Sequence, residues 1–295
     1  MPKKIASTRE SIVSTAPDPI SHAETGARRY GPVRYVVTAY LTFWLMVLAL
    51  CGSASMVFHA PPLVMRILSD VCAWSPTLVL FVLLPRLRPG TTRGAFLRSC
   101  FAGRIRPGLL ALCVLVTGGV FLLSVALSSH WTGSVFSCAG PVWLSVVLSV
   151  LSGPTGEECG WRGYLRPELE GRFGFLRGNL LLGVIWAFWH TVLWVVDNEF
   201  TSGWPLLVYV LSNVLVMTAL NVIMAVVLER APNLLYACLI HLCFNLPYSF
   251  LTPTIPFYIV LTILYVLAAA AMLLVRGSWQ RRQPTPTTAA RTPRS

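Results

Sequence analysis

Long apolar runs alternate with polar, mostly basic segments along the chain. Several runs reach the roughly 20 residues that a helix needs to cross a hydrocarbon core about 30 Å thick. A chain in lipid must satisfy its backbone internally, which favours helices over irregular structure. The pattern therefore predicts an all-α membrane protein, a bundle of about eight transmembrane helices, at residues 35–58, 63–84, 108–128, 140–164, 179–196, 204–228, 234–250 and 256–275.

The two ends of the chain have a different composition from the apolar runs. Residues 1–34 are rich in Ser, Thr, Pro and charges of both signs, and we expect a disordered cytoplasmic tail there. Residues 276–295 are rich in Arg, Thr and Pro, and we expect a second disordered, basic tail. The first apolar run begins too late for a signal peptide, so we interpret it as an uncleaved anchor.

Lys and Arg residues occupy every second connection between the predicted helices. They lie in the N-terminal tail, after the second, fourth and sixth helices, and in the C-terminal tail; Arg66, inside the second helix, is the exception. Cytoplasmic loops carry the excess of basic residues in membrane proteins. We therefore predict a multi-pass protein of the cell membrane with both termini in the cytoplasm.

Composition supports a membrane protein and argues against a nucleic-acid binder. The chain is 55% hydrophobic and only 12% charged, whereas about a quarter of the residues in a soluble domain are charged. The net charge of +12 comes from loops and tails, where basic residues face anionic lipid. The eight cysteines include no CxxC pair and lie mostly in or beside apolar runs, so we expect them to pack as small apolar side chains.

Ionisable residues inside a span cost about 2.5–3.5 kcal/mol each on insertion scales, so each one needs a reason. Arg66 and Asp70 are four residues apart and can form a structural pair on one helix face. Asn213 and Asn221 can hydrogen-bond to neighbouring helices. The other polar residues in the predicted spans are Glu157, Glu158, Arg162, His190, His241 and Asn245.

Two adjacent carboxylates end the fourth predicted helix. Arg162 follows Glu158 by four residues and can neutralise it. Glu157 is rotated about 100° away on the helix and has no partner at helical spacing. Two carboxylates would be a costly way to pack helices, so we expect Glu157 to act as a general base.

Two histidines and an amide lie at depths compatible with these carboxylates. His241 and Asn245 share one face of the seventh predicted helix, and His190 lies on the fifth. At a rise of about 1.5 Å per residue, Glu157 and His241 fall in the cytoplasmic half of the bilayer and His190 falls near its midplane. We therefore expect one hydrated cavity shared by three helices.

This set of side chains suits hydrolysis. Glu157, with His190, would activate water, and His241 with Asn245 would stabilise the oxyanion. Alternatively, Glu157, His190 and His241 could bind a zinc ion with an open fourth position, and the sequence does not separate the two. The chain contains no GxSxG elbow and no HExxH helix, and nothing at helical spacing activates Cys159.

Three short segments carry a resemblance to a known family. "EECGWRGYLRPEL", "IWAFWH" and "HLCFN" resemble the motifs EExxxR, FxxxH and HxxxN/D of the intramembrane CAAX-protease and bacteriocin-processing family, also called Abi. Trp186 stands where the second motif commonly has Phe. The resemblance covers residues of about 140–250, within a transmembrane protease domain expected at 35–275.

The resemblance implies the same roles for the site residues as the spacing does. It also implies an endopeptidase acting near the cytoplasmic face on a membrane-associated peptide or protein, prenylated or bacteriocin-like. It leaves open whether a metal, with zinc as the candidate, takes part. Two other interpretations stay open at this point: a non-catalytic immunity or scaffolding protein on the same fold, and a proton-coupled transporter.

Overall fold

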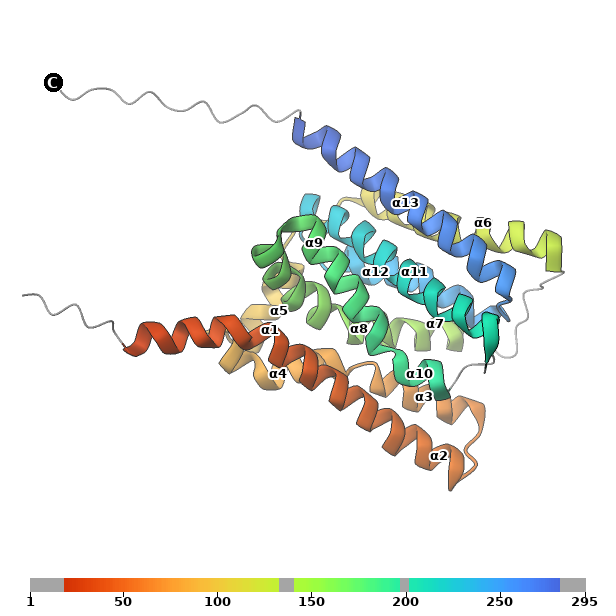
Figure 1. The fold of residues 1–295 in the computed structure, drawn as a ribbon, viewed down its shortest axis with the longest axis horizontal. Coiled ribbons are helices and arrows are strands. Elements are labelled where there is room, and N and C mark those ends of the chain that lie inside the picture. The colour runs from red at the N-terminus through yellow and green to blue at the C-terminus, as the bar shows by residue number, and fades with distance from the viewer. Residues whose placement is uncertain (1–18, 133–140, 197–201, 282–295) are drawn as a thin grey trace, which may run out of the picture.

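A computed structural model describes residues 19–132, 141–196 and 202–281. All the regular elements in these ranges are helices, apart from one isolated bridge residue at Leu251. Figure 1 shows α6 and α13 along one side of the bundle and α1 to α4 along the other, with the remaining helices between them. The prediction of an all-α protein is confirmed.

Within the described ranges, five segments are long and apolar enough to cross a membrane. They combine the following elements: α1 (Pro19–Met46), a π-helical turn (Val47–Cys51) and α2 (Gly52–Met56); α3 (Pro62–Cys72) and α4 (Ser75–Leu87); α6 (Pro107–Thr132); α11 (Gly203–Arg230); and α13 (Ile255–Arg281). These match the first, second, third, sixth and eighth predicted spans. The short helix α5 (Arg93–Phe101) lies in the basic loop after α4.

The other three predicted spans are shorter or broken helices. The fourth consists of α7 (Val142–Leu151), α8 (Gly153–Gly156) and a π-helical segment (Cys159–Leu165). The fifth consists of the end of α9 (Arg166–Trp189), which is bent at Gly174 (φ 76°), and α10 (Thr191–Val196). The seventh consists of α12 (Leu235–Asn245) and a 3₁₀ turn (Leu246–Phe250). These three carry the sequence motifs.

The helix ends extend into both expected tails. α1 begins at Pro19, so it includes part of the segment 1–34, and α13 continues to Arg281. The remaining tail residues, 1–18 and 282–295, lie outside the described ranges. The side of the membrane on which the termini lie stays a prediction.

The first helix illustrates how the bundle separates core from lipid. Tyr35, Ala39 and Phe43 are buried at four-residue spacing, whereas the apolar residues Leu41 and Leu45 on the other face are exposed. Apolar side chains on both faces are typical of a helix that packs inward and meets lipid outward. Five of the described cysteines are buried, as their expected packing role requires.

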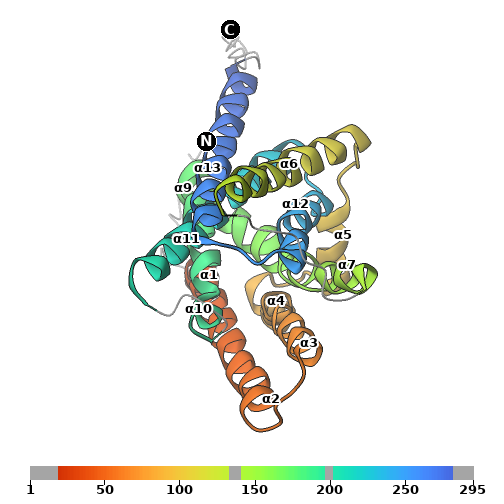
Figure 2. The same cartoon turned by 90° about the vertical axis from the view of Figure 1, so that its right-hand side faces the viewer.

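α11 is the central helix of the bundle. A continuous stretch from Ala219 to Leu228 is buried, and α11 packs against both α9 and α13. α12 packs against α6 (Figure 2) and also against α8. This arrangement brings the first motif, which directly follows α8, together with the motifs on α9 and α12 in the middle of the molecule.

Candidate active site

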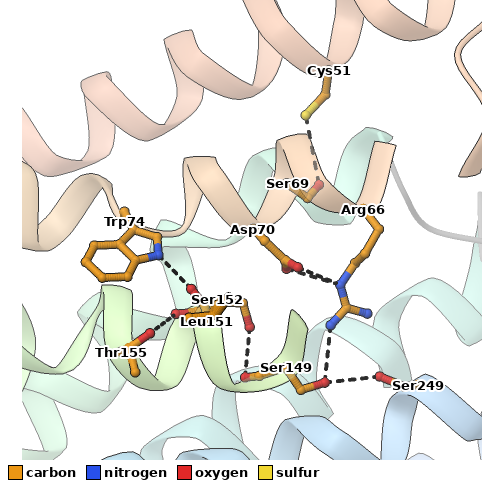
Figure 3. Close-up of polar contacts among 10 residues, drawn as sticks. All are labelled: Cys51, Arg66, Ser69, Asp70, Trp74, Ser149, Leu151, Ser152, Thr155 and Ser249. Carbon is orange, nitrogen blue, oxygen red and sulfur yellow. Dashed lines mark hydrogen bonds and ion pairs between the residues drawn. The ribbon is translucent and has the colours of Figure 1, made fainter. Parts of the chain in front are cut away.

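The two carboxylates follow a break in the fourth span. Pro154 has no N–H to donate to the carbonyl of Val150, so the helix cannot continue through it. The hydroxyl of Thr155 donates to that carbonyl instead, at 2.8 Å. The indole of Trp74 donates to the neighbouring carbonyl of Leu151 at 2.6 Å (Figure 3). These two side chains donate to backbone carbonyl groups that have no helical donor at the break and that lipid could not satisfy.

Glu158 is the centre of a buried ion pair. Its Oε1 accepts hydrogen bonds from Nη1 of Arg162 at 3.0 Å and from Nδ1 of His241 at 2.7 Å. The exposed fraction of each of the three residues is 2% or less. The predicted pairing of Glu158 with Arg162 is confirmed, and the pair also fixes the orientation of the His241 ring.

Arg162 also ties the pair to the centre of the bundle. Its Nε donates to Oδ1 of Asn221 at 3.1 Å, and Asn221 donates to the backbone carbonyl of Asn179 at 2.7 Å. The expected interhelical role of Asn221 is confirmed. Asn213 differs from the expectation, because it donates to the carbonyl of Tyr209 within its own helix.

Glu157 takes its partner from α9, outside its own helix. The indole N–H of Trp186 donates to Oε2 of Glu157 at 2.6 Å. The same indole lies under the guanidinium of Arg162 at 3.9 Å, and its ring centroid lies 5.1 Å from that of His241. Trp186 therefore touches three of the charged or titratable side chains of the site.

The absence of a side chain at Gly153 leaves room between Glu157 and His241. A Cβ built on Gly153 would lie 2.6 Å from Oε1 of Glu157 and 2.9 Å from Nε2 of His241. These two atoms therefore converge on the same point beside α8. Oε1 of Glu157 and Nε2 of His241 can then both reach one small molecule such as water.

His190 lies where α9 gives way to α10. Its Nδ1 lies 2.9 Å from the carbonyl oxygen of Trp186. A carbonyl can only accept, so Nδ1 carries the hydrogen and Nε2 of the neutral ring is left as an acceptor. Its ring also packs edge-on against Trp189, with the centroids 4.7 Å apart.

A cavity of about 870 Å³ joins the remaining polar groups. Glu157, His190 and Asn245 all line it, together with Gly153 from α8. Glu158 and Arg162 are not among its lining residues, so the ion pair supports the cavity wall from behind. The six predicted site residues thus separate into two groups. Glu157, His190 and Asn245 line the cavity, Glu158 and Arg162 are buried behind it, and His241 contacts Glu158 and approaches Gly153 in the cavity wall.

The proposed zinc ligands do not fit a metal site. Within the three described ranges, no group of three or more His, Cys, Asp or Glu side chains is placed to hold a metal ion. A His₂Glu site needs all three ligands about 2.0–2.2 Å from one point. Glu157, His190 and His241 therefore do not form the His₂Glu set that the sequence suggested.

The sequence interpretation missed two residues of the site. Trp186 was considered only as the aromatic of a motif, although its indole supplies a hydrogen-bond donor that Phe lacks. Gly153 gave no signal beyond the dipeptide Gly-Pro, which marks a break in a helix. Spacing along one helix could not reveal the bond between Trp186 and Glu157 or the approach of Gly153 to His241, since each joins two different helices.

Comparison with known proteins agrees with this geometry. Residues 139–247 match the family model described as "Type II CAAX prenyl endopeptidase Rce1-like". The chain is also 25% identical over 218 residues to a protein named CAAX prenyl protease 2 from Methanococcus maripaludis, covering 68% of this chain and 78% of that protein. These matches confirm the resemblance to the CAAX-protease family.

The match to the CAAX-protease family model fits the placement of the motifs. The matched range begins just before α7 and ends in the 3₁₀ turn after α12, so it includes every predicted site residue. The flanking helices α1 to α4 and α13 lie outside it. Although α1 lies outside the matched range, it supports the site, because Phe43 stacks on Trp189 with the ring centroids 3.7 Å apart.

Proposed function

We propose that the chain is an intramembrane endopeptidase that hydrolyses a peptide bond of a membrane-associated substrate near the cytoplasmic face. The observation that carries the proposal is the convergence of Glu157 and His241 beside Gly153, at the wall of a large cavity. The family match supports protease activity. The prenyl-protease name of the relative makes a prenylated protein the first substrate to test.

Glu157 is the general base in this proposal. Its Oε1 takes a proton from a water molecule in the cavity, while Trp186 holds Oε2 in place. Nε2 of His190 accepts the second hydrogen of the same water and orients it. The water oxygen attacks the carbonyl carbon of the substrate, and Glu157 then passes the proton to the leaving amine.

His241 and Asn245 stabilise the tetrahedral oxyanion. Nδ1 of His241 already donates to Glu158, so Nε2 carries a hydrogen only when the ring is an imidazolium. An imidazolium balances the site, because Arg162 and His241 then offset the two carboxylates. The amide of Asn245 supplies the second donor from the cavity wall. Buried donors aimed at a developing charge are worth several kcal/mol, roughly 2.7–4 for one such group.

The test is cleavage of a prenylated reporter peptide by the purified protein in lipid nanodiscs. Glu157→Gln removes the base with little change in shape and should abolish cleavage. Glu168→Gln is the matched control, because it removes a carboxylate that is 31% exposed, pairs with Arg88 at 3.4 Å and lies outside the cavity lining. Full activity of Glu157→Gln would overturn the role of Glu157 as the base, whereas no cleavage by the parent protein would favour a non-catalytic scaffold.

A further inference from the structure

Arg230, in the last turn of α11, carries a charge that no carboxylate in the described ranges neutralises. Its guanidinium lies 4.2 Å from the ring centroid of Trp279 on α13 and donates to no acceptor among the described residues. Other arginines do pair with a carboxylate, including the pair predicted on α3: Arg66–Asp70, Arg88–Glu168, Arg162–Glu158, Arg166–Glu170 and Arg276–Glu229. Arg230 is thus held in place by an aromatic ring while its hydrogen-bond donors stay open.

The neighbouring Arg276 is stacked in a similar way but is neutralised. Its guanidinium lies 3.6 Å from the ring centroid of Phe175 on α9, and its Nε and Nη2 donate to the two carboxylate oxygens of Glu229 at 2.6 and 2.8 Å. Glu229 directly precedes Arg230 in the chain, so the carboxylate closest to Arg230 in sequence is already bound. Arg230 is exposed, and an acceptor for it can therefore come from outside the chain.

A buried asparagine brings two further arginines to this end of the bundle. The side chain of Asn233 is 2% exposed and donates to the backbone carbonyls of Phe101 at 3.0 Å and Gly103 at 2.6 Å. It therefore fixes the loop between α5 and α6 against the loop between α11 and α12. Arg104 and Arg106 lie in the first of these loops, both exposed, and neither side chain has an acceptor in the part of the chain that the structure describes.

These arginines gather where three membrane-spanning segments begin or end. The apolar segments through α11 and α13 end with the turns that carry Arg230 and Trp279, and the segment through α6 begins directly after Arg106. Tryptophan is enriched at membrane–water interfaces, where its ring lies at the level of the headgroups. Four arginines and the single carboxylate of Glu229 leave three positive charges here: Arg104, Arg106, Arg230 and Arg276.

A phosphate group that brings a net negative charge fits this arrangement. A guanidinium binds two phosphate oxygens through parallel N–H donors, and a cation–π contact uses none of those donors. The stack on Trp279 therefore presents the donors of Arg230 in one plane, which lowers the entropy cost of binding. A zwitterionic lipid would bring its own ammonium group toward the other arginines, whereas an anionic lipid brings only negative charge.

We propose that Arg230 and Trp279, with Arg104 and Arg106 beside them, form a binding site for the headgroup of an anionic phospholipid. The phosphate pairs with Arg230, and the arginines of the loop between α5 and α6 add attraction over a longer range. None of these four residues lines the large cavity, so the site takes a lipid of the surrounding bilayer and leaves the proposed substrate position free. The inference stands independently of the role of Glu157.

Binding is measured by native mass spectrometry of the full chain in a neutral detergent, as the fraction that carries one lipid during titration with phosphatidylglycerol or phosphatidylcholine. We expect phosphatidylglycerol to bind roughly tenfold more tightly, because each arginine near the headgroup adds to the attraction. Arg230→Gln should reduce this preference several-fold, and Trp279→Leu should reduce it although every arginine is retained. Arg86→Gln is the matched control and should keep the preference, because Arg86 also lies exposed in the last turn of a spanning helix, α4, on the other side of the bundle (Figure 1).

Equal affinity for the two lipids would overturn the proposal. An equal loss in Arg230→Gln and Arg86→Gln would also overturn it, because the attraction would then depend on total charge and not on one site. Inorganic phosphate is added in a separate arm: displacement of phosphatidylglycerol at millimolar phosphate would assign the site to free phosphate, whereas retention of the lipid supports a headgroup site. The midpoint of thermal unfolding of each variant reports whether it is folded, and Arg230→Lys, which keeps the charge and loses the fork, should show a partial loss of the preference.

Discussion

The indole N–H of Trp186 donates a 2.6 Å hydrogen bond to Oε2 of Glu157, and it does so from a different helix. Both residues are buried, with exposed fractions of 1% and 3%. A short bond to an ionised acceptor in low dielectric is stronger than a neutral one. The bond therefore restricts the rotation of the carboxylate, and Oε1 points toward Gly153 and the cavity.

Trp186→Phe should slow turnover while retaining the fold. Phenylalanine keeps an aromatic ring against Arg162 and His241 but removes the donor to Glu157. We expect kcat to fall roughly tenfold, about 1.4 kcal/mol, with little change in KM. Steady-state kinetics on the reporter peptide provide the measurement.

Trp189→Phe is the matched control for this substitution. Trp189 is equally buried, and its indole donates to the backbone carbonyl of Ala39 at 3.3 Å. Its loss should lower the midpoint of thermal unfolding, and because Phe keeps a ring against His190, kcat should fall far less than in Trp186→Phe. Equal kcat in Trp186→Phe and the parent protein would show that Glu157 needs no such support.

Gly153→Ala should remove activity by filling the space between the base and the oxyanion donor. The added Cβ would lie 2.6 Å from Oε1 of Glu157 and 2.8 Å from Cε1 of His241, closer than real contacts allow. We expect at least a hundredfold loss in kcat/KM, because one or both side chains must turn away.

Gly118→Ala tests whether any added methyl group has this effect. Nothing lies within 4 Å of a Cβ at Gly118, and the residue lies on α6, away from the cavity lining. Its activity should equal that of the parent protein. An active Gly153→Ala variant would contradict the assignment of the water position.

The sequence predicted those parts of the site that depend on one helix. Glu158 and Arg162 are four residues apart, and that spacing alone brings them together. The partner of Glu157 could not be predicted in this way, because Trp186 reaches it across the bundle. Approximate depth placed His241 near the carboxylates, and its bond to Glu158 depends on the packing of α12 against α8.

Hydropathy overestimated the continuity of the helices that carry the motifs. Hydropathy averaged over a window reports how apolar a segment is. The average hardly changes when one residue lacks a backbone N–H to donate to the helix. Pro154 breaks the fourth span, and the signal was present in the Gly-Pro pair. The helix also breaks at His190, and no residue type in the sequence marks that break. The indole of Trp44, from another helix, donates to the backbone carbonyl of Trp189 there.

Arg162→Ala should destabilise the protein far more than a comparable substitution near the surface. It would leave Glu158 buried with only His241 as a partner and would remove the donor to Oδ1 of Asn221. Removing one partner of a buried pair costs about 3–5 kcal/mol. We expect low expression and a large fall in the midpoint of thermal unfolding in detergent.

Arg166→Ala provides the comparison at the same spacing. Arg166 and Glu170 also form an i,i+4 pair at 3.0 Å, but their side chains are 16% and 23% exposed. Glu170 keeps a hydrogen bond from Asn179 at 2.7 Å. Its loss should cost about 1 kcal/mol or less. Similar destabilisation by the two substitutions would refute the central role of the Glu158 pair.

Chelators should leave cleavage unchanged if Glu157 activates water directly. His190 uses Nδ1 on the carbonyl of Trp186, and His241 uses Nδ1 on Glu158, so each ring has only Nε2 left for a ligand. The described side chains bring no three such groups to one point. Activity after treatment with 1,10-phenanthroline, compared with treatment by a non-chelating isomer, is the measurement. Loss of activity that zinc restores would show that substrate binding rearranges His190 and His241 around a metal, and would replace the mechanism proposed for Glu157.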